Sequence, residues 1–524
     1  MPVVPNALGI RVTLLLQPSP TSMAMPPMPP SLLRISPPLS AQQTTSTSYA
    51  ILISIFEILK EAHFMSHLQT LDAYFAEHRA RHLEELNEFL RIPSISALSE
   101  HKEDMRTAAN WLADALKKLN IENVAVEETD GHPVVYGEWL HAEGKPTILF
   151  YGHYDVQPVD PLELWETPPF EPAIRDNKLF ARGSSDDKGQ VFMHVKMIEA
   201  LFATEGTLPV NVKFIYEGEE EIGSPALPEY TEENKEKLAA DLILISDTGL
   251  YAKGKPAVCY GLRGLTGVQI DIRGAKGDLH SGLYGGGVQN AIHALTEILA
   301  SFRDEHGTIQ VEGFYDNVLP LSEEERQAYR DLNFDEAALK EEVGVKELFG
   351  EAGFSYLEQT WARPTLEVNG VFGGFSGEGI KTVLPAEAGA KITCRLVPNQ
   401  DPEEIVALLK AHIEKHKPVG VDVVVSEFDK GKPYITPFDH PVIQAAGRSY
   451  EKVYNVPTAY TRGGGSIPIV AAFDEILDLP VVLMGFGLSS ENFHAPNEHF
   501  HLENFDQGLR VLGDYMHEIA NIKL

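Results

Sequence analysis

The sequence is poor in cysteine and in basic residues. Only two cysteines, Cys259 and Cys394, occur in 524 residues, which is too few for the disulfide framework that stabilises small secreted proteins. We therefore expect a reducing, cytoplasmic environment. Lys and Arg number 43 against 76 Asp and Glu, a formal net charge of −33. Such a charge repels polyphosphate and anionic membranes, so we expect neither nucleic acid nor a membrane as a partner.

Long hydrophobic runs are missing as well. The apolar run 49–56 is too short to span a bilayer and lies too far along the chain for an ordinary signal peptide. It belongs to a first segment, residues 1–64, that is rich in Pro, Ser, Thr and Met and nearly free of acids. We expect this segment to be disordered, or to be upstream sequence translated in front of a natural start at Met65.

The chain from residue 65 onward alternates between two hydrophobic periods. Apolar residues at helical spacing predict helices at 68–90, 105–119 and 189–202. Short apolar runs predict strands at 124–126, 134–136, 147–151, 210–216 and 242–245. This alternation indicates an α/β fold, with a mixed, largely parallel sheet flanked by helices.

After Gly264 the pattern changes to that of a smaller α+β unit. Strands are expected at 268–272, 388–396 and 421–426, with helices near 289–303 and 402–416. The acidic stretch 321–350 is interpreted as solvated surface helices. A strand at 481–484 and a last helix at 505–522 return to the first unit. We therefore expect one domain at 65–263 and 435–524, interrupted by a second domain at 264–434.

Five polar clusters follow predicted strands or open a helix. They lie at 152–155, 181–189, 217–224, 246–248 and 491–498, and together they contain two His and several carboxylates. Each has a plainer interpretation by itself. A His-x-Asp is commonly a surface pair, acids at a helix start are commonly caps, and an acidic turn can simply be solvated.

Taken together, the five clusters favour a metal site. The carboxyl ends of parallel strands meet at one edge of a sheet, where such folds carry their chemistry. Carboxylates gathered there repel one another unless a cation neutralises them. Mixed imidazole and carboxylate ligands suit Zn²⁺ or Mn²⁺, with Co²⁺ as a further alternative. No Cys-based motif and no Gly-x-Ser-x-Gly nucleophile elbow competes with this interpretation.

From roughly residue 67 to its end, the chain resembles the metallopeptidase family of carnosinase, cytosolic non-specific dipeptidase, aminoacylase, succinyl-diaminopimelate desuccinylase and carboxypeptidase G. The resemblance is carried by the stretches 151–158, 182–189 and 217–224. Further stretches point to the carnosinase-like dipeptidase branch, namely 260–264, 278–282, 375–377, 381–385 and 395–399. The inserted domain is then expected to be a ferredoxin-like lid that also forms a homodimer.

The resemblance implies an exopeptidase with two divalent metal ions per subunit, Zn²⁺ above all, that hydrolyses dipeptides or small peptide-like amides with a free carboxylate. The implied metal ligands are His153 and Asp247 for one ion, Glu221 and His494 for the other, and Asp186 bridging both. Asp155 is implied to hold His153 in place, and Glu220 to be the general base. A cis peptide between Asp186 and Asp187 is implied as well.

Other residues are implied to bind the substrate. His280 of the partner subunit would stabilise the oxyanion, and Arg395 would bind the substrate carboxylate with help from Thr382 and Ser466. The chain departs from many relatives at Gly463, where they carry Glu. Two alternatives stay open: an N-acyl-amino-acid deacylase, and a catalytically silent homologue that binds metals or peptides. The presence of Glu220 argues against the silent homologue.

Overall fold

The computed structural model describes residues 67–428, 430–464 and 467–523. The predictions for segment 1–64 and for Ser466 therefore lie outside the described residues. Residues 67–90 are helical, and the predicted apolar stripe is buried, since Leu71, Leu86 and Leu90 have no exposed surface. No helix in the described ranges has the length and apolar character needed to cross a membrane.

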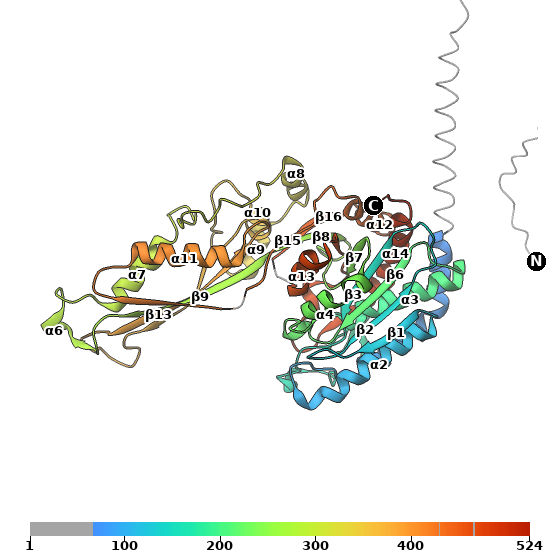
Figure 1. Cartoon of the computed structure of the whole chain (residues 1–524), viewed down its shortest axis with the longest axis horizontal. Helices are drawn as coiled ribbons and strands as arrows, with labels where there is room; N and C mark the ends of the chain where they lie inside the picture. The colour runs from blue at the N-terminus through green and yellow to red at the C-terminus, as the bar shows by residue number, and fades with distance from the viewer. Residues whose placement is uncertain (1–66, 429, 465–466, 524) are drawn as a thin grey trace, which may run out of the picture. The chain divides into compact units, whose positions relative to one another are not determined.

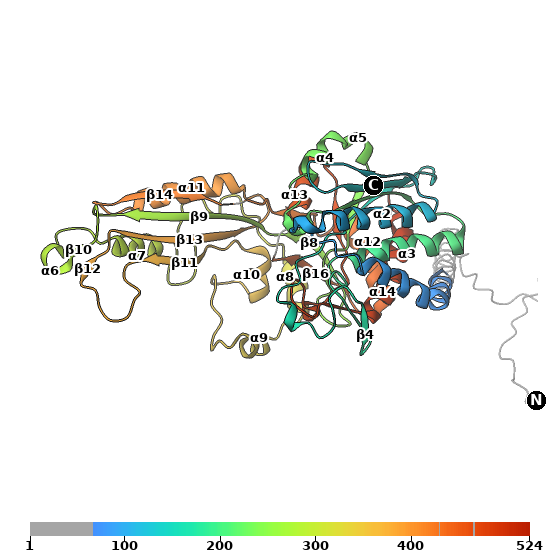
Figure 2. The ribbon, with the colours of Figure 1, turned by 90° about the horizontal axis from the view of Figure 1, so that it is seen from below.

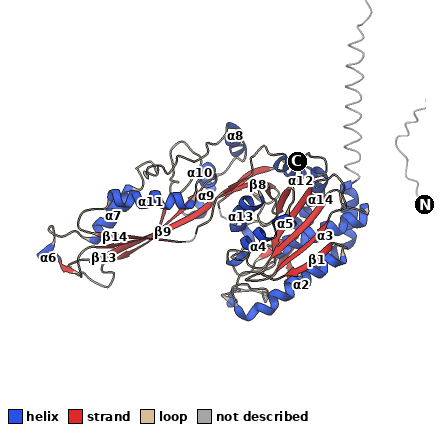
Figure 3. Ribbon diagram, viewed as in Figure 1, coloured by secondary structure: helices blue, strands red, loops and turns tan. Residues whose placement is uncertain are grey.

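The described residues form a mixed nine-stranded sheet with a parallel centre (Figures 1 and 3). Its order is β1 (Glu122–Glu127), β2 (Val134–Trp139), β6 (Asn211–Glu217), β3 (Thr147–His153), β7 (Leu242–Ile245), β17 (Val481–Leu483), β8 (Ala257–Leu262) and β15 (Tyr434–Ile435), with β16 (Ala459–Gly463) beside β8. Strands β6, β3, β7 and β17 run parallel, as predicted. The pair β1–β2 is antiparallel because a short connection joins the two strands.

Helices cover both faces of this sheet (Figure 2). Alternate residues of β3 point to opposite faces. Leu149 and Tyr151 share a core with α4 (Leu227–Glu233) and α13 (Pro468–Leu477), whereas Phe150 packs on His194 of α3 (Lys188–Glu205). Helix α3 also packs on α14 (Leu502–Ile519), which contacts α12 (Pro441–Tyr454). Helix α2 (Lys102–Lys118) covers β1 and β2.

A second sheet has four antiparallel strands in the order β11 (Glu367–Gly373), β13 (Glu387–Leu396), β9 (Gly264–Arg273) and β14 (Asp422–Glu427). Helices α7 (Ala291–Ser301) and α11 (Pro402–His416) pack on it around a core of its own. The chain order β9-α7-β11-β13-α11-β14 is the β-α-β-β-α-β arrangement of ferredoxin-like folds. The predicted α+β unit is confirmed.

Smaller elements complete the described chain. They are β10 (Leu279–His280) paired with β12 (Val383–Leu384), the sheet of β4 (Ala173–Arg175), β5 (Lys178–Phe180) and β18 (His499–His501), the short helices α5 (Lys235–Leu238) and α6 (Ser281–Tyr284), and the 3-10 helices η1 (Ser99–His101), η2 (Leu162–Leu164), η3 (Glu220–Ile222) and η4 (Ser489–Glu491).

The acidic stretch 321–350 differs in part from its prediction. It forms α8 (Glu323–Asp331) and α9 (Glu336–Val343), and α10 (Tyr356–Ala362) follows. On α8, Glu325 and Tyr329 are buried rather than solvated. Glu325 accepts a hydrogen bond of 2.8 Å from the Tyr260 hydroxyl and pairs with Arg462. The prediction of a fully solvated face is wrong at α8, because Arg462 supplies the counter-charge that lets a carboxylate be buried.

Candidate metal centre

Two site residues are brought together by the register of the parallel strands β3 and β7. Tyr151 pairs with Ile245 in that register, so His153 and Asp247, each two residues further on, end side by side. The distance from His153 Nε2 to Asp247 Oδ2 is 3.9 Å. His153 is fully buried, and the Asp247 side chain is 18% exposed. The sheet therefore places an imidazole and a carboxylate together at its carboxyl edge.

Asp186 lies between the two histidines of the cluster. It belongs to the loop that leads into α3, and its peptide bond to Asp187 is cis, as the resemblance implies. Asp186 Oδ1 lies 3.2 Å from His153 Nε2, and Asp186 Oδ2 lies 2.9 Å from His494 Nε2. One carboxylate thus offers one oxygen to each imidazole, which is the arrangement of a bridging ligand.

Glu221 and His494 form the other side of the cluster. Glu221 lies in η3, directly after β6, and its Oε2 is 3.2 Å from His494 Nε2. His494 is the most exposed member, at 54% of its side chain. It comes from the loop between η4 and β18 and has a positive φ of 57°. Glu220, next to Glu221, offers a carboxylate oxygen within 4.8 Å of ligand atoms of His153 and Asp247.

Two further side chains hold these groups in place. Asp155 is fully buried, and both its backbone carbonyl oxygen, at 3.2 Å, and its Oδ1, at 3.3 Å, lie near His153 Nδ1. Its Oδ2 accepts a hydrogen bond of 3.1 Å from the backbone N–H of Glu221. Gln157 donates a hydrogen bond of 2.7 Å to Glu221 Oε2. Asp155 therefore orients an imidazole and a neighbouring backbone at once, as partners of metal ligands commonly do.

The cluster carries more negative charge than its own residues can neutralise. Burial and the nearby Asp247 and Asp186 raise the pKa of Glu220 to about 9, although His153 opposes this. Burial and Asp186 raise the pKa of Asp247 to about 7. Hydrogen bonds from His494 to Asp186 and Glu221 raise the pKa of that imidazole to about 10. These shifts show that the site favours added positive charge.

The donor set fits divalent transition-metal ions. The side chains fall into two groups, whose ligand atoms lie within 4.8 Å of one another: His153, Glu220 and Asp247, and Asp186, Glu221 and His494. One buried ring nitrogen of the cluster, His153 Nε2, makes no hydrogen bond. Buried polar atoms are normally satisfied, so an unsatisfied imidazole nitrogen aimed at carboxylates is accounted for by an ion. Imidazole with carboxylate is a zinc-type ligand set.

Glu498 organises the Asp186 loop, a role that the sequence did not reveal. Its carboxylate is fully buried and accepts hydrogen bonds from the backbone N–H groups of Gly183, Ser185 and Asp186, at 2.9 to 3.1 Å. It also pairs with the buried Arg182 at 2.8 Å. In the sequence Glu498 sits in a polar loop and looks solvated. The one available signal was its closeness to His494.

Replacing Glu498 with glutamine should lower the free energy of unfolding by about 3 kcal/mol, because Arg182 would lose the carboxylate that compensates its burial. Urea unfolding of the metal-stripped protein measures this loss. The matched control is Glu163→Gln, which changes an exposed glutamate and should leave stability unchanged. A loss below about 1 kcal/mol, the scale of a surface ion pair, would contradict the assigned role.

The remaining predicted site residues lie outside this cluster. His280 is exposed at the end of β10, and its Nδ1 accepts a hydrogen bond of 3.0 Å from the Gly282 N–H. Thr382 is beside it, since its carbonyl accepts a hydrogen bond of 3.0 Å from Ser281. Arg395 is half-buried on β13. In the described ranges, no hydrogen bond or ion pair joins these three residues to the cluster.

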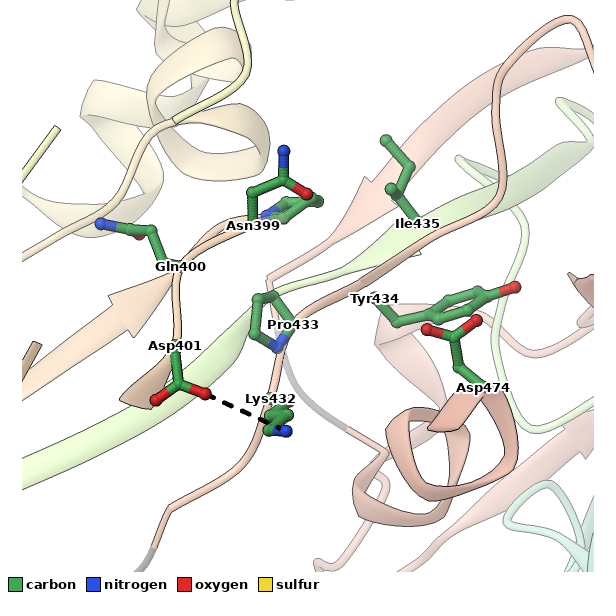
Figure 4. Close-up of a pocket in the computed structure, with 9 residues that line it drawn as sticks. Asn399, Gln400, Asp401, Lys432, Pro433, Tyr434, Ile435 and Asp474 are labelled. Atoms are coloured by element: carbon green, nitrogen blue, oxygen red, sulfur yellow. Dashed lines mark ion pairs between the residues drawn. The ribbon is translucent and has the colours of Figure 1, made fainter. Parts of the chain in front are cut away.

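A cavity of about 350 Å³ lies elsewhere, where the connection from β13 to α11 faces β15 (Figure 4). Asp401 and Lys432 approach to 4.0 Å at this cavity. Asp474 lies close to the ring of Tyr434, and burial and nearby acids raise its pKa. No member of the metal cluster lines this cavity.

The model of peptidase family M20/M25/M40 matches residues 149–518, which include every member of the metal cluster. The chain belongs to this family. It is therefore a peptidase, a hydrolase that acts on peptide bonds. The metallopeptidase family predicted from the sequence is confirmed, and the similar proteins confirm its carnosinase-like dipeptidase branch.

Named relatives are similar over most of their length. The Cys-Gly metallodipeptidase dug1 of Schizosaccharomyces pombe is 32% identical over 458 residues, 83% of this chain and 95% of that protein. The Beta-Ala-His dipeptidase of Homo sapiens is 31% identical over 472 residues, 87% of this chain and 93% of that protein. Both are named as dipeptidases.

Solved structures share the fold at similar identity. An M20 family metallo-carboxypeptidase from Sulfolobus solfataricus has a TM-score of 0.71 and 36% identity, covering 84% of this chain and 99% of that one. Human carnosine dipeptidase 1 has a TM-score of 0.69 and 31% identity, covering 87% and 99%. The fold predicted from the sequence, a largely parallel sheet flanked by helices with a second α+β unit, is that of these structures.

Proposed function

We propose that this chain is a two-metal dipeptidase that cleaves dipeptides, or small peptide-like amides, with a free carboxylate. The observation that carries the proposal is the Asp186 carboxylate, which lies 3.2 Å from His153 and 2.9 Å from His494 with one oxygen each. The names of the similar dipeptidases support the choice of substrate.

Five residues would hold the ions: His153 and Asp247 on one side, Glu221 and His494 on the other, and Asp186 between them. Zn²⁺ is the proposed ion, with Mn²⁺ or Co²⁺ as alternatives, because imidazole and carboxylate ligands suit all three. When bound, such ions lower the pKa of a coordinated water and polarise a carbonyl oxygen. Asp155 keeps His153 oriented through its 3.3 Å contact with Nδ1.

Glu220 is the proposed general base. Its carboxylate takes a proton from the attacking water on one oxygen and returns that proton to the amide nitrogen as the C–N bond breaks. To act as a base it must be ionised. The carboxylate repulsion that helps raise its pKa to about 9 therefore has to be neutralised, which cations beside Asp247 and Glu221 would do.

Arg395 is proposed to bind the substrate carboxylate, and Thr382 and Ser466 are proposed as further substrate-binding residues. A guanidinium matches a carboxylate through two parallel hydrogen bonds. A second guanidinium group, that of Arg263, lies near Arg395. Burial and the nearby Arg395 lower the pKa of Arg263 to about 10. In the described part of the chain, neither Arg263 nor Arg395 forms an ion pair with a carboxylate. Two guanidinium groups without a protein carboxylate suit an anionic ligand.

A cytoplasmic homodimer is part of the proposal, with the second sheet as lid and dimerisation domain. Apolar side chains are exposed around it, including Leu283 at 77% and Ile380 at 92%. Such exposure suits a surface that a partner covers. His280 lies among these residues on β10 and would complete the site of the other subunit as an oxyanion donor. Two buried, unpaired cysteines agree with a reducing compartment.

Mixing two inactive variants tests the shared site. Glu220→Gln lacks the base and His280→Ala lacks the donor, yet a heterodimer holds one site with both residues intact. Random exchange of subunits should restore about a quarter of the wild-type activity, because half of the dimers are mixed and each has one working site. Dipeptide hydrolysis before and after exchange measures this. No recovery, with heterodimers shown by mass spectrometry, would contradict the assignment of His280.

The alternative function is an N-acyl-amino-acid deacylase, which would use the same metals on another acyl group. A substrate panel run with Zn²⁺ and Mn²⁺ in parallel separates the two. It should contain Cys-Gly, β-Ala-His, ordinary dipeptides and N-acetyl amino acids. We expect cleavage of the unmodified dipeptides. Exclusive cleavage of the N-acyl amino acids would overturn the proposal.

A further inference from the structure

A second group of metal-competent side chains lies where three helices meet. His67 begins the described first helix, Glu205 ends α3, and His517 lies in the last turn of α14. Their ligand atoms lie within 4.8 Å of one another. Helices α3 and α14 pack against each other (Figures 1 and 2). These residues therefore converge although they are far apart in the sequence.

Both imidazoles lie within hydrogen-bond distance of the same carboxylate oxygen. Glu205 Oε1 lies 2.8 Å from His67 Nδ1 and 3.0 Å from His517 Nε2. The two imidazole rings are close, with 3.8 Å between their centroids. The other nitrogen of His67, Nε2, is buried and makes no hydrogen bond. The nitrogens that face Glu205, Nδ1 of His67 and Nε2 of His517, are thus brought together around one carboxylate oxygen, as the ligands of a single ion would be.

We propose that His67, Glu205 and His517 bind a divalent transition-metal ion of the Zn²⁺ class that fastens the first helix to α3 and α14. The proposal concerns a structural site and does not depend on the proposed dipeptidase function. Its ligand atoms are Nδ1 of His67, Oε1 of Glu205 and Nε2 of His517.

The spacing of the donors suits such an ion. Zinc bonds to imidazole nitrogen and carboxylate oxygen are about 2.0–2.2 Å long, so tetrahedral ligands stand roughly 3.3 Å from one another. The observed 2.8 and 3.0 Å need only a small outward movement of side chains. Glu205 and His517 are 26% and 28% exposed, which leaves room for water as the fourth ligand.

The helix ends add a favourable field. Glu205 is the last residue of α3, and His517 is two residues before the end of α14 at Ile519. A helix carries partial negative charge at its carboxyl end, where unpaired carbonyl groups are exposed. Two such ends meet here beside an ionised carboxylate, so a cation is stabilised by all three. The ion would link the first helix to the last one.

Zinc content tests the site. The wild type, His517→Gln and Glu205→Gln are stripped with a chelator, dialysed to equilibrium against Zn²⁺ and analysed by mass spectrometry of the metal. Wild type should hold one zinc ion per chain more than either variant. The control is His141→Gln, since His141 forms an exposed imidazole–carboxylate pair with Glu122 at 3.0 Å and belongs to no group of three. It should bind as much zinc as wild type.

Two variants are used so that one misfolded protein, detected by circular dichroism, does not decide the result. A higher zinc content in wild type than in either folded variant would support the proposal. Equal zinc content in wild type and both folded variants would overturn it. If the catalytic cluster did not bind zinc, the zinc content of all four proteins would fall by the same amount. The difference between wild type and the His517 and Glu205 variants would therefore still test this site even if the proposed function were wrong.

Discussion

Replacing Glu220 with glutamine is expected to lower dipeptide turnover by about 100-fold or more while leaving metal content unchanged, since general base catalysis contributes that much or more. The amide has nearly the shape of the carboxylate but cannot accept the proton of the attacking water. Glu220 lies within 4.8 Å of ligand atoms of His153 and Asp247. It is therefore placed to serve the reacting water without being one of the five proposed ligands.

The matched control for this variant is Glu229→Gln. Glu229 lies in the first turn of α4, which follows η3 in the chain, and is exposed, so its change should leave turnover as in wild type. Steady-state rates and metal content are measured on the same preparations. Turnover of Glu220→Gln near that of wild type, at equal metal content, would refute the assignment of the base.

Replacing Asp186 with asparagine should weaken the binding of both ions and abolish activity. Its two oxygens lie 3.2 and 2.9 Å from the two histidines. An amide keeps one oxygen and presents an NH₂ group, which cannot bind a cation, in place of the other. Loss of a residue that merely supports a ligand costs about 10–100-fold in metal affinity. The loss of a shared ligand should therefore reach at least the upper end of that range for each ion.

Competition with a chelator of known zinc affinity measures the binding constants. The control is Asp176→Asn, in the exposed turn between β4 and β5, where Asp176 has a φ of 48°. Asparagine adopts this conformation readily, so the control should bind metal as wild type does. Unchanged affinity for both ions in Asp186→Asn would contradict the role of Asp186 as a ligand shared by the two ions.

Much of the fold follows from hydrophobic periodicity. The strand 242–245 and the helix 402–416 are found within the predicted bounds, because each is a clean pattern set between turn residues. Strands β11 and β16 were not predicted. Four of the seven residues of β11 are Glu, Asn and Gly, and its residues are mostly exposed, so an edge strand of this kind lacks the alternation that marks a half-buried one.

Individual site residues were predictable, but their supports were not. His153 and Asp247 end neighbouring parallel strands, so the pattern alone places both at one edge of the sheet. Glu498 and Glu325 are acids whose burial depends on Arg182 and Arg462, each far away in the sequence. A single sequence does not show such pairing, and an isolated acid in a polar segment is normally solvated.

Asp186 is proposed to join two metal ions, one beside His153 and one beside His494. Diffraction from crystals of the zinc-loaded protein, collected at the zinc absorption edge, tests it most directly. We expect two anomalous peaks in contact with the Asp186 carboxylate, one next to each imidazole. A single peak at Asp186, or none, would contradict it.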